Sequence, residues 1–336
     1  MVMIWRPTCS VRAPSTQSLC RSTSSSDHMR GTSLSSRQVK SPSCSSELPR
    51  CGGVNPPVAA ERFQILRSCG GRMRLLVISD LHLEFGPFTF PTPMPDFDAA
   101  VFAGDIGQPI STAVEWMAQQ RGELGALRGR QIIYVPGNHE FYRSEFKANL
   151  AEGRAAAELA GIELLFRRTA VVGGVRFIGC ILWTDYRIRG TPKPSMVHAG
   201  QTLNDHRLIR YLQEDGHYSR FMPWHAAAEH RLDLAFIRHE LGTPFAGPTV
   251  VITHHAPHPK SIQARHEGSS LTPAFVSDLG HVIQELQPEL WIHGHDHGSH
   301  DYRVGRTRIF ANQAGYPNVH GDRENPGFDP RCVVEI

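Results

Sequence analysis

The stretch Leu290–His300, LWIHGHDHGSH, joins a short apolar run to four histidines within eleven residues. The run Leu290–His293 predicts a short buried strand. His293, His295 and His297 occupy alternate positions at its end, and residues two apart face the same side of an extended chain. The stretch therefore predicts a strand whose carboxyl end can present several imidazoles to one small volume.

The same arrangement, an apolar run that ends in polar residues, occurs four times earlier in the chain. The runs LLVIS, AAVFAG, IIYVPG and TVVIT end in Asp80-Leu81-His82, Asp105, Asn138-His139-Glu140 and His254-His255, respectively. In α/β sheets, ligands bind beyond the carboxyl ends of the strands. Packing alone does not explain five such junctions, so they predict one composite site.

Short apolar runs alternate with helix-compatible segments from Met73 onward, which predicts α/β layers around sheets. The predicted strands are Leu75–Ser79, Ala99–Ala103, Gln131–Val135, Val175–Ile181, Thr249–Thr253, Leu290–His293, Thr307–Asn312 and Cys332–Ile336. The predicted helices are Ser111–Arg121, Ser144–Ala160, Trp224–Leu241 and Thr272–Leu286. A Gly-Gly pair within Val171–Ile181 predicts a β-hairpin. An irregular insertion is expected between Asp185 and Pro223.

The polar residues at the strand ends suit metal binding. Carboxylate and imidazole together favour Mn, Fe or Zn, whereas an all-oxygen set would favour Mg or Ca. One ion rarely needs so many side chains, but two ions do when a carboxylate bridges them. Two ions roughly 3.5–4 Å apart can clamp the attacking and leaving oxygens of a displacement at phosphorus. Gly104, Gly137 and Gly294 precede the key residues and permit close approach of the backbone.

Residues 1–72 differ in composition from the rest of the chain. They hold ten basic and three acidic residues and five of the seven cysteines, whereas residues 73–336 hold 25 basic and 29 acidic residues and eighteen of the nineteen histidines. The slight acidic excess of residues 73–336 does not favour binding to nucleic acid. No apolar run is long enough to predict a membrane span. Few cysteines and many histidines are compatible with a cytoplasmic metalloenzyme.

The segment 1–72 predicts a disordered leader because it is rich in Ser, Arg and Pro and has no hydrophobic period. An organellar transit peptide would have this Arg- and Ser-rich, acid-poor composition. We favour the alternative that translation begins near Met73, where an apolar strand starts directly at a methionine. In either case the predicted folded domain spans residues 73–336.

Taken together, the strand-end residues resemble the five motifs of the calcineurin-like metallophosphoesterase superfamily. The motifs are Asp80-x-His82, Gly104-Asp105, Gly137-Asn138-His139-Glu140, His254 and Gly294-His295-x-His297, in the family's order. The resemblance spans about Met73 to Ile336. It implies a four-layer α/β/β/α sandwich of two mixed sheets flanked by helices, with the metals at the strand ends.

The resemblance also implies a role for each motif residue. Asp80, His82 and His297 are implied to bind the first metal, Asn138, His254 and His295 the second, and Asp105 both. His139 is implied to lie near the substrate phosphate and to donate a proton to the leaving oxygen or stabilise charge. A hydroxide held between the two metals is the implied nucleophile for in-line attack on phosphorus.

Four other polar residues are candidates to support the ligands or to contact substrate, namely Glu140, His255, Asp185 and Arg207. Glu140 is expected to orient a neighbouring group rather than to bind metal. Segment 185–223 is a candidate substrate lid, with Arg207 or Arg210 meeting phosphate.

Polar residues elsewhere have simpler interpretations. Asn204-Asp205 is expected to cap a helix, and Tyr316 either lines the pocket or ends a strand. His293 is expected to form hydrogen bonds at its strand end, and His300 to be solvated. Three histidines on the predicted helix Trp224–Leu241 are expected at the surface or at an interface: His225, His230 and His239.

The favoured function is metal-dependent hydrolysis of a small phosphomonoester or phosphodiester. Alternatives within the class are nuclease and nucleotide pyrophosphatase activity. The alternative outside it is a non-catalytic protein-binding scaffold on the same fold, which predicts missing ligands, and none is missing here. The sequence leaves the substrate, the native metals and the oligomeric state open.

Overall fold

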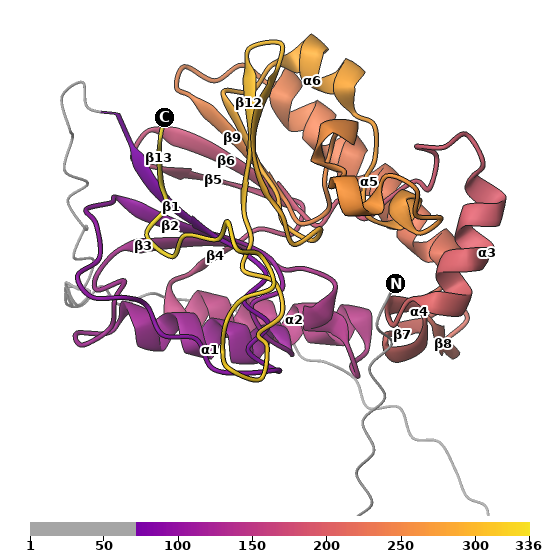
Figure 1. Cartoon of the computed structure of the whole chain (residues 1–336), viewed down its shortest axis with the longest axis horizontal. Coiled ribbons are helices and arrows are strands. Elements are labelled where there is room, and N and C mark those ends of the chain that lie inside the picture. The colour runs from indigo at the N-terminus through magenta and orange to yellow at the C-terminus, as the bar shows by residue number, and fades with distance from the viewer. Residues whose placement is uncertain (1–71) are drawn as a thin grey trace, which may run out of the picture. The chain divides into compact units, whose positions relative to one another are not determined.

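The computed structural model describes residues 72–336, so the predictions about the leader lie outside the described residues. Two sheets form the centre of the domain (Figure 1). The first sheet has the order β13 (Val333–Glu335), β1 (Arg74–Ile78), β2 (Ala99–Ala103), β3 (Gln131–Val135) and β4 (Glu163–Leu164). The second has the order β11 (Ser299–Val304), β12 (Thr307–Asn312), β10 (Leu290–Ile292), β9 (Thr249–Thr253), β6 (Val175–Cys180) and β5 (Arg168–Val172).

Both sheets are mixed. In the first sheet β1 to β4 are parallel and β13 is antiparallel to β1. In the second, β6, β9, β10 and β12 are parallel, and the edge strands β5 and β11 are antiparallel to their neighbours. The β5–β6 pair turns at Gly173-Gly174, which confirms the predicted hairpin.

Alternation along the strands assigns their side chains to different cores. In β1, Leu75 and Val77 belong to a cluster shared with Phe177 of the second sheet, so this cluster fills the space between the sheets. Leu76 and Ile78 belong instead to the cluster that contains residues of the neighbouring helices. Burial of one such side chain contributes about 1.5–3 kcal/mol. Strands buried on both faces explain why the sequence runs are continuously apolar.

Helices cover the outer face of each sheet (Figure 1). Helices α1 (Ile110–Arg121) and α2 (Phe146–Ala160) pack against the first sheet through residues such as Met117 and Leu150. Helices α5 (Pro223–Gly242) and α6 (Gly280–Leu286) pack against the second through residues such as Ile237 and Ile283. The order of layers confirms the predicted four-layer α/β/β/α sandwich.

The predicted helix Thr272–Leu286 is wrong in its first half. Only a 3₁₀ turn (Thr272–Ala274) and α6 are helical. Between them the backbone pairs with another loop, because Ser277 N donates to Ala256 O at 3.0 Å and Leu279 N donates to Pro257 O at 2.9 Å. A tertiary contact thus replaces the local helix.

The insertion after Asp185 is more regular than predicted. It contains α3 (Pro192–Thr202), α4 (Asp205–Leu208) and the hairpin of β7 (Arg210–Leu212) and β8 (Tyr218–Arg220). Pro192 begins α3, a position where proline loses no helical hydrogen bond. Among residues 72–336, no helix has both the length and the apolar character needed to cross a bilayer.

Candidate dinuclear metal centre

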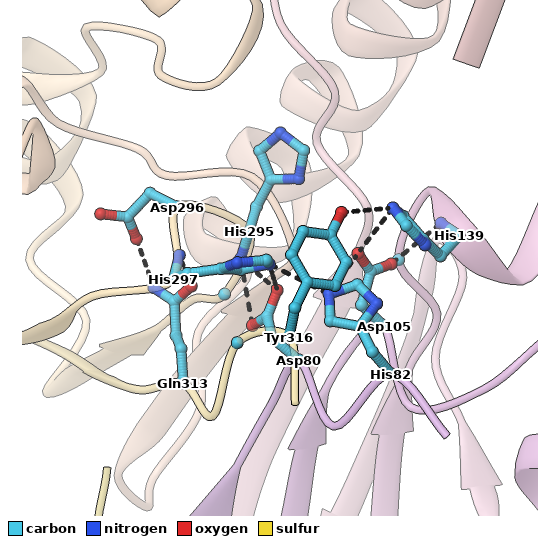
Figure 2. A network of polar contacts seen from close by, with 12 residues as sticks. Asp80, His82, Asp105, His139, His295, Asp296, His297, Gln313 and Tyr316 are labelled. Atoms are coloured by element: carbon cyan, nitrogen blue, oxygen red, sulfur yellow. Dashed lines mark hydrogen bonds and ion pairs between the residues drawn. The ribbon is translucent and has the colours of Figure 1, made fainter. Parts of the chain in front are cut away.

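The carboxyl ends of β1, β2 and β3 from one sheet and of β9 and β10 from the other meet at one cluster of polar side chains (Figure 2). Three sets of ligand atoms each lie within 4.8 Å of one another: Asp80–His82–His297, His82–Asp105–His139 and Asp105–His254–His295. These residues are at most 9% exposed. The structure therefore brings together the residues that the five strand ends were predicted to deliver.

The first group comprises Asp80, His82 and His297. The Nε2 atoms of the two histidines lie 3.0 Å apart, and Asp80 Oδ1 lies 3.6 Å from His297 Nε2. Each histidine has a carboxylate behind it: His82 Nδ1 donates to Glu84 at 3.1 Å, and His297 Nδ1 donates to Glu324 at 2.6 Å. Both Nε2 atoms therefore carry lone pairs that face the same point.

The second group comprises Asn138, His254 and His295. Asn138 Oδ1 lies 3.0 Å from His254 Nε2 and 3.1 Å from His295 Nδ1, and the two ring nitrogens are 3.2 Å apart. His254 Nδ1 donates to the backbone carbonyl of Ala103 at 2.8 Å, which leaves its Nε2 unprotonated in the neutral ring. Three electron-pair donors thus converge here as well.

Asp105 lies between the two groups. Its Oδ1 is 3.4 Å from His254 Nε2, and its Oδ2 is 3.7 Å from His82 Nε2. One carboxylate therefore reaches both groups, one oxygen to each. Asp105 Oδ1 also accepts a hydrogen bond from His139 N at 2.9 Å, which fixes the carboxylate relative to the loop after β3.

The donor set fits a pair of cations. Facing lone pairs repel one another unless a proton or a metal ion lies between them. Burial lowers the pKa of His82 to about 4 and the pKa of His295 well below its usual value, so both rings stay neutral, as metal binding requires. Burial opposes charge on His254 too, but Asp105 outweighs it and raises the pKa of His254 to about 10. The buried carboxylates thus favour positive charge at this point.

His139 lies beside the two groups with both ring nitrogens engaged. Its Nδ1 donates to Glu84 at 2.8 Å, and its Nε2 lies 3.2 Å from the hydroxyl of Tyr316 and 4.0 Å from Asp105 Oδ2 (Figure 2). Burial opposes protonation of this ring, but Asp105 and Glu84 together raise the pKa of His139 to about 9. The two carboxylates therefore favour the protonated form of His139, which can donate a proton.

The backbone of the site is held in unusual conformations. Asp80, His82, Asp105, His295 and His297 all have φ between +47° and +80°. Each such residue costs of order 1–3 kcal/mol, and strain of this kind clusters at functional sites.

Two glycines leave the room that these turns need. A Cβ on Gly104 would collide with the His254 ring, and a Cβ on Gly137 would collide with Asp105. The prediction that these glycines permit close approach is confirmed.

Glu140 holds two of the site loops together. Its carboxylate accepts hydrogen bonds from the backbone N–H groups of Asp105, Ile106 and Gly137 at 2.8–3.0 Å and from the Tyr134 hydroxyl at 2.8 Å. It does not belong to the groups of converging ligand atoms. This placement agrees with a residue that orients its neighbours.

The other candidates lie around the site rather than in it. His255 is buried, its ring lies 4.0 Å from the His295 ring, and its Nδ1 has no hydrogen-bond partner within residues 72–336. Asp185 accepts from Arg187 N at 2.9 Å in a local turn, and Arg207 is exposed on α4. The structure does not bring Asp185 or Arg207 into the ligand cluster.

Two predictions about histidines outside the motifs are wrong. His300 is not a solvated loop residue, because it lies on β11 and its Nε2 bonds Asp296 Oδ2 at 2.7 Å. His230 is not at the surface, because it is 2% exposed and its Nδ1 donates to Leu182 O at 2.9 Å. His293, as predicted, uses both nitrogens behind the site, toward Ser261 and Gly294 O.

The helix-cap interpretation of Asn204-Asp205 is correct only in position, because Asn204 is the N-cap residue of α4. The Asn204 side chain makes no cap bond to α4. Asp205 Oδ1 accepts instead from Asn138 Nδ2 and from the Tyr142 hydroxyl, each at 2.7 Å. Asp205 therefore contacts the second group, where Asn138 supplies one donor and the neighbouring Tyr142 supplies another.

Sequence reasoning missed the two carboxylates behind the first group. Glu84 continues the alternation of Asp80 and His82, so its place two residues further on could have revealed it. Glu324 lies in a loop after β12 with no pattern around it, and nothing in the sequence pointed to it. Gln313, whose Oε1 accepts from His297 N at 2.6 Å, was given no role, although its position directly after β12 is the same strand-end signal that found the ligands.

The two mixed sheets flanked by helices and the paired groups of Asp, Asn and His side chains form a possible metal site at the strand ends. The model of the calcineurin-like phosphoesterase family matches residues 73–299, and the chain belongs to this family. The match covers every strand end that contributes to the two groups.

One sequence relative and one solved structure show how far the likeness extends. Uncharacterized protein L509 of Acanthamoeba polyphaga mimivirus is 24% identical over 290 residues, which cover 79% of this chain and 97% of that protein. The crystal structure of phosphopantetheinyl hydrolase (PptH) from Mycobacterium tuberculosis aligns with a TM-score of 0.58 at 16% identity, over 80% of this chain and 97% of that one. At this identity the second likeness supports the fold alone.

Proposed function

We propose that the protein hydrolyses small phosphoric esters at a centre of two metal ions. The observation that carries the proposal is the position of Asp105, whose two oxygens point to two separate groups of converging donors. Asp80, His82 and His297 would hold one ion, and Asn138, His254 and His295 the other. Mixed nitrogen and oxygen donors favour Mn, Fe or Zn.

The ions, when bound, would act as Lewis acids that activate water for in-line attack and neutralise charge on the phosphate oxygens. The protein's part is to supply the proton. His139, whose protonated form Glu84 and Asp105 favour, presents Nε2 at the edge of the centre beside the Tyr316 hydroxyl. A general acid in this position would protonate the leaving oxygen.

Tyr316 is the aromatic side chain that lies over the first group. Its ring centroid is 4.3 Å from that of His82 and 4.6 Å from that of His297, and the residue is 41% exposed. Its hydroxyl could donate to a phosphate oxygen at the position where His139 would act. This arrangement supports a substrate that approaches from the Tyr316 side.

The geometry of the site does not identify the organic group that is attached to the phosphate. The slight acidic excess of residues 73–336 supports a small phosphorylated molecule over a nucleic acid. Because the fold resembles that of a phosphopantetheinyl hydrolase, a phosphopantetheinyl ester belongs among the substrates to test.

The test is a hydrolysis assay on the full chain loaded with Mn²⁺ or Zn²⁺, with bis-p-nitrophenyl phosphate and p-nitrophenyl phosphate as substrates. Turnover that disappears in Asp105→Asn supports the proposal, and the ratio of diester to monoester rates selects the substrate class. Turnover that Asp105→Asn leaves unchanged would overturn it. Failure to bind metal and to hydrolyse either ester would favour a binding scaffold.

A further inference from the structure

The second group has a feature that the first group lacks: an acidic side chain from the insertion reaches one of its ligands. Asp205 begins α4, more than sixty residues after Asn138 in the chain, and is 5% exposed. Its Oδ1 accepts from Asn138 Nδ2 at 2.7 Å and from the Tyr142 hydroxyl at 2.7 Å. Asn138 Nδ2 also lies 3.2 Å from that hydroxyl, which completes a closed triangle.

The triangle determines which end of the Asn138 amide faces the ligands. The oxygen and the NH₂ of an asparagine side chain are nearly the same size, so shape alone does not orient the amide. A carboxylate only accepts hydrogen bonds, and it therefore holds the NH₂ on its own side. The oxygen is then left facing His254 Nε2 and His295 Nδ1, where a cation needs it.

The insertion is well anchored where it supplies this carboxylate. His206, the next residue, bonds the carbonyl of Phe221 through Nδ1 at 2.8 Å and lies 3.3 Å from the Tyr186 hydroxyl through Nε2. Arg143 N donates to Leu208 O at 2.9 Å, which ties α4 to the segment after β3. Asp205 is thus fixed to the same loop that carries Asn138.

We infer that Asp205 is a positioning residue for the second metal ion: it holds the Asn138 amide with its oxygen toward the ion and thereby links the insertion to metal occupancy. The inference rests on the proposed metal centre and does not require turnover. Groups that orient metal ligands typically change metal affinity 10–100-fold when they are replaced.

The substitution that tests this is Asp205→Asn. An asparagine at this position can offer an NH₂, and Asn138 can then turn its oxygen toward it and its NH₂ toward the ion. We expect the second ion to bind about 10–100-fold more weakly and the first ion to bind within about twofold of the wild-type affinity. The matched control is Asn204→Ala, which alters the preceding residue, whose side chain makes no cap bond.

The experiment is a calorimetric titration of the metal-free full chain with Mn²⁺ alone. Two sites in the wild type and in Asn204→Ala, with one weakened in Asp205→Asn, support the inference. Two unchanged sites in Asp205→Asn overturn it. If those titrations support the inference but no ester is hydrolysed, only the proposed activity fails. Fewer than two metal sites in the wild type would overturn both the proposed function and the inference about Asp205.

A second variant keeps the test valid if Asp205→Asn does not fold. Tyr142→Phe removes one donor to Asp205 and leaves the bond from Asn138, so the second ion should bind about 2–10-fold more weakly, as one lost hydrogen bond predicts. Coupling between sites is reciprocal, and Mn²⁺ should therefore slow hydrogen exchange in α4 of the wild type. The absence of both effects would overturn the link to the insertion.

Discussion

The two ligand groups have similar donors facing the centre and different support behind them. In the first group, loop carboxylates hold the imidazoles, and Glu324 is exposed enough to pair with Arg265 at 2.9 Å. In the second group, the support is the carbonyl of Ala103 and the buried Asp205. Anionic partners make an imidazole a stronger ligand. From this difference we expect that charged partners of the imidazoles would set the affinity of the first group for an ion, and that the orientation of the Asn138 amide would set the affinity of the second.

The largest effect is expected where the two groups meet. In Asp105→Asn the NH₂ end of the side chain cannot bind a cation, so the side chain can contact only one of the two proposed ions. We expect metal content to fall from about two ions per chain to one or fewer, and kcat/KM to fall on the order of 10³-fold, the equivalent of several kcal/mol of charge stabilisation. Elemental analysis and the diester assay measure both.

The matched control for that change is Asp301→Asn, which removes an exposed carboxylate paired with Arg308 on the second sheet. It should leave metal content and rate as they are. Equal metal content in Asp105→Asn and the wild type would show that the two groups do not share this carboxylate.

The next largest effect concerns the backbone beneath the second group. In Gly104→Ala, a Cβ would collide with His254 at a residue whose φ is +91°. We expect a loss of about 2–4 kcal/mol in the free energy of unfolding, from strain and displaced packing together. Urea denaturation of the metal-free chain gives this value.

Gly190→Ala separates the two causes, because Gly190 also has a positive φ, +73°, but has open space around its Cβ position. It should lose only the conformational part of the free energy of unfolding, about 1–2 kcal/mol. Similar losses in the two variants would mean that the contact with His254 contributes nothing.

Glu324→Gln tests whether the support behind the first group changes the metal affinity of that group alone. The amide can still accept from His297 but carries no charge, so the first ion should bind about 10–100-fold more weakly. The second ion should keep its affinity, the reverse of the pattern expected for Asp205→Asn. Titration with Mn²⁺ distinguishes them, and Glu335→Gln on β13 is an exposed control. Loss of the same ion in both variants would refute the division into two groups.

The smallest effect is expected at Tyr316. Tyr316→Phe keeps the ring over His82 and His297 and removes only the hydroxyl near His139. We expect kcat/KM to fall about 2–10-fold, the equivalent of one hydrogen bond, with metal affinity unchanged. Steady-state kinetics beside a Mn²⁺ titration would show this, and a change in metal affinity instead would assign Tyr316 a structural role.

The parts of the molecule that local patterns determine could be predicted from the sequence. Continuous apolar runs identified strands such as β2 and β9 to the residue, because both faces of these strands are buried. The ligand candidates followed from their position at strand ends, because the carboxyl ends of strands from both sheets meet at one place in the fold. Asp105 and His254 were found in this way although about 150 residues separate them.

The parts that depend on contacts between loops could not be predicted. The predicted helix Thr272–Leu286 includes the segment before α6, but that segment pairs with Ala256 and Pro257 instead. Glu324 contacts a ligand from a loop, and Asp205 contacts one from the start of α4 in the insertion; no periodicity in the sequence reveals either position. Asp205 also had a simpler local interpretation as a helix cap. Its true partner became evident only from the fold.

The most direct test of the central claim is the electron paramagnetic resonance spectrum of the full chain loaded with Mn²⁺. If Asp105 joins the two groups in one centre, two ions should lie roughly 3.5–4 Å apart. Two equivalents of Mn²⁺ should then give the spectrum of a coupled pair, and Asp105→Asn should abolish the coupling. A wild-type spectrum of isolated Mn²⁺ ions at every loading would contradict the account.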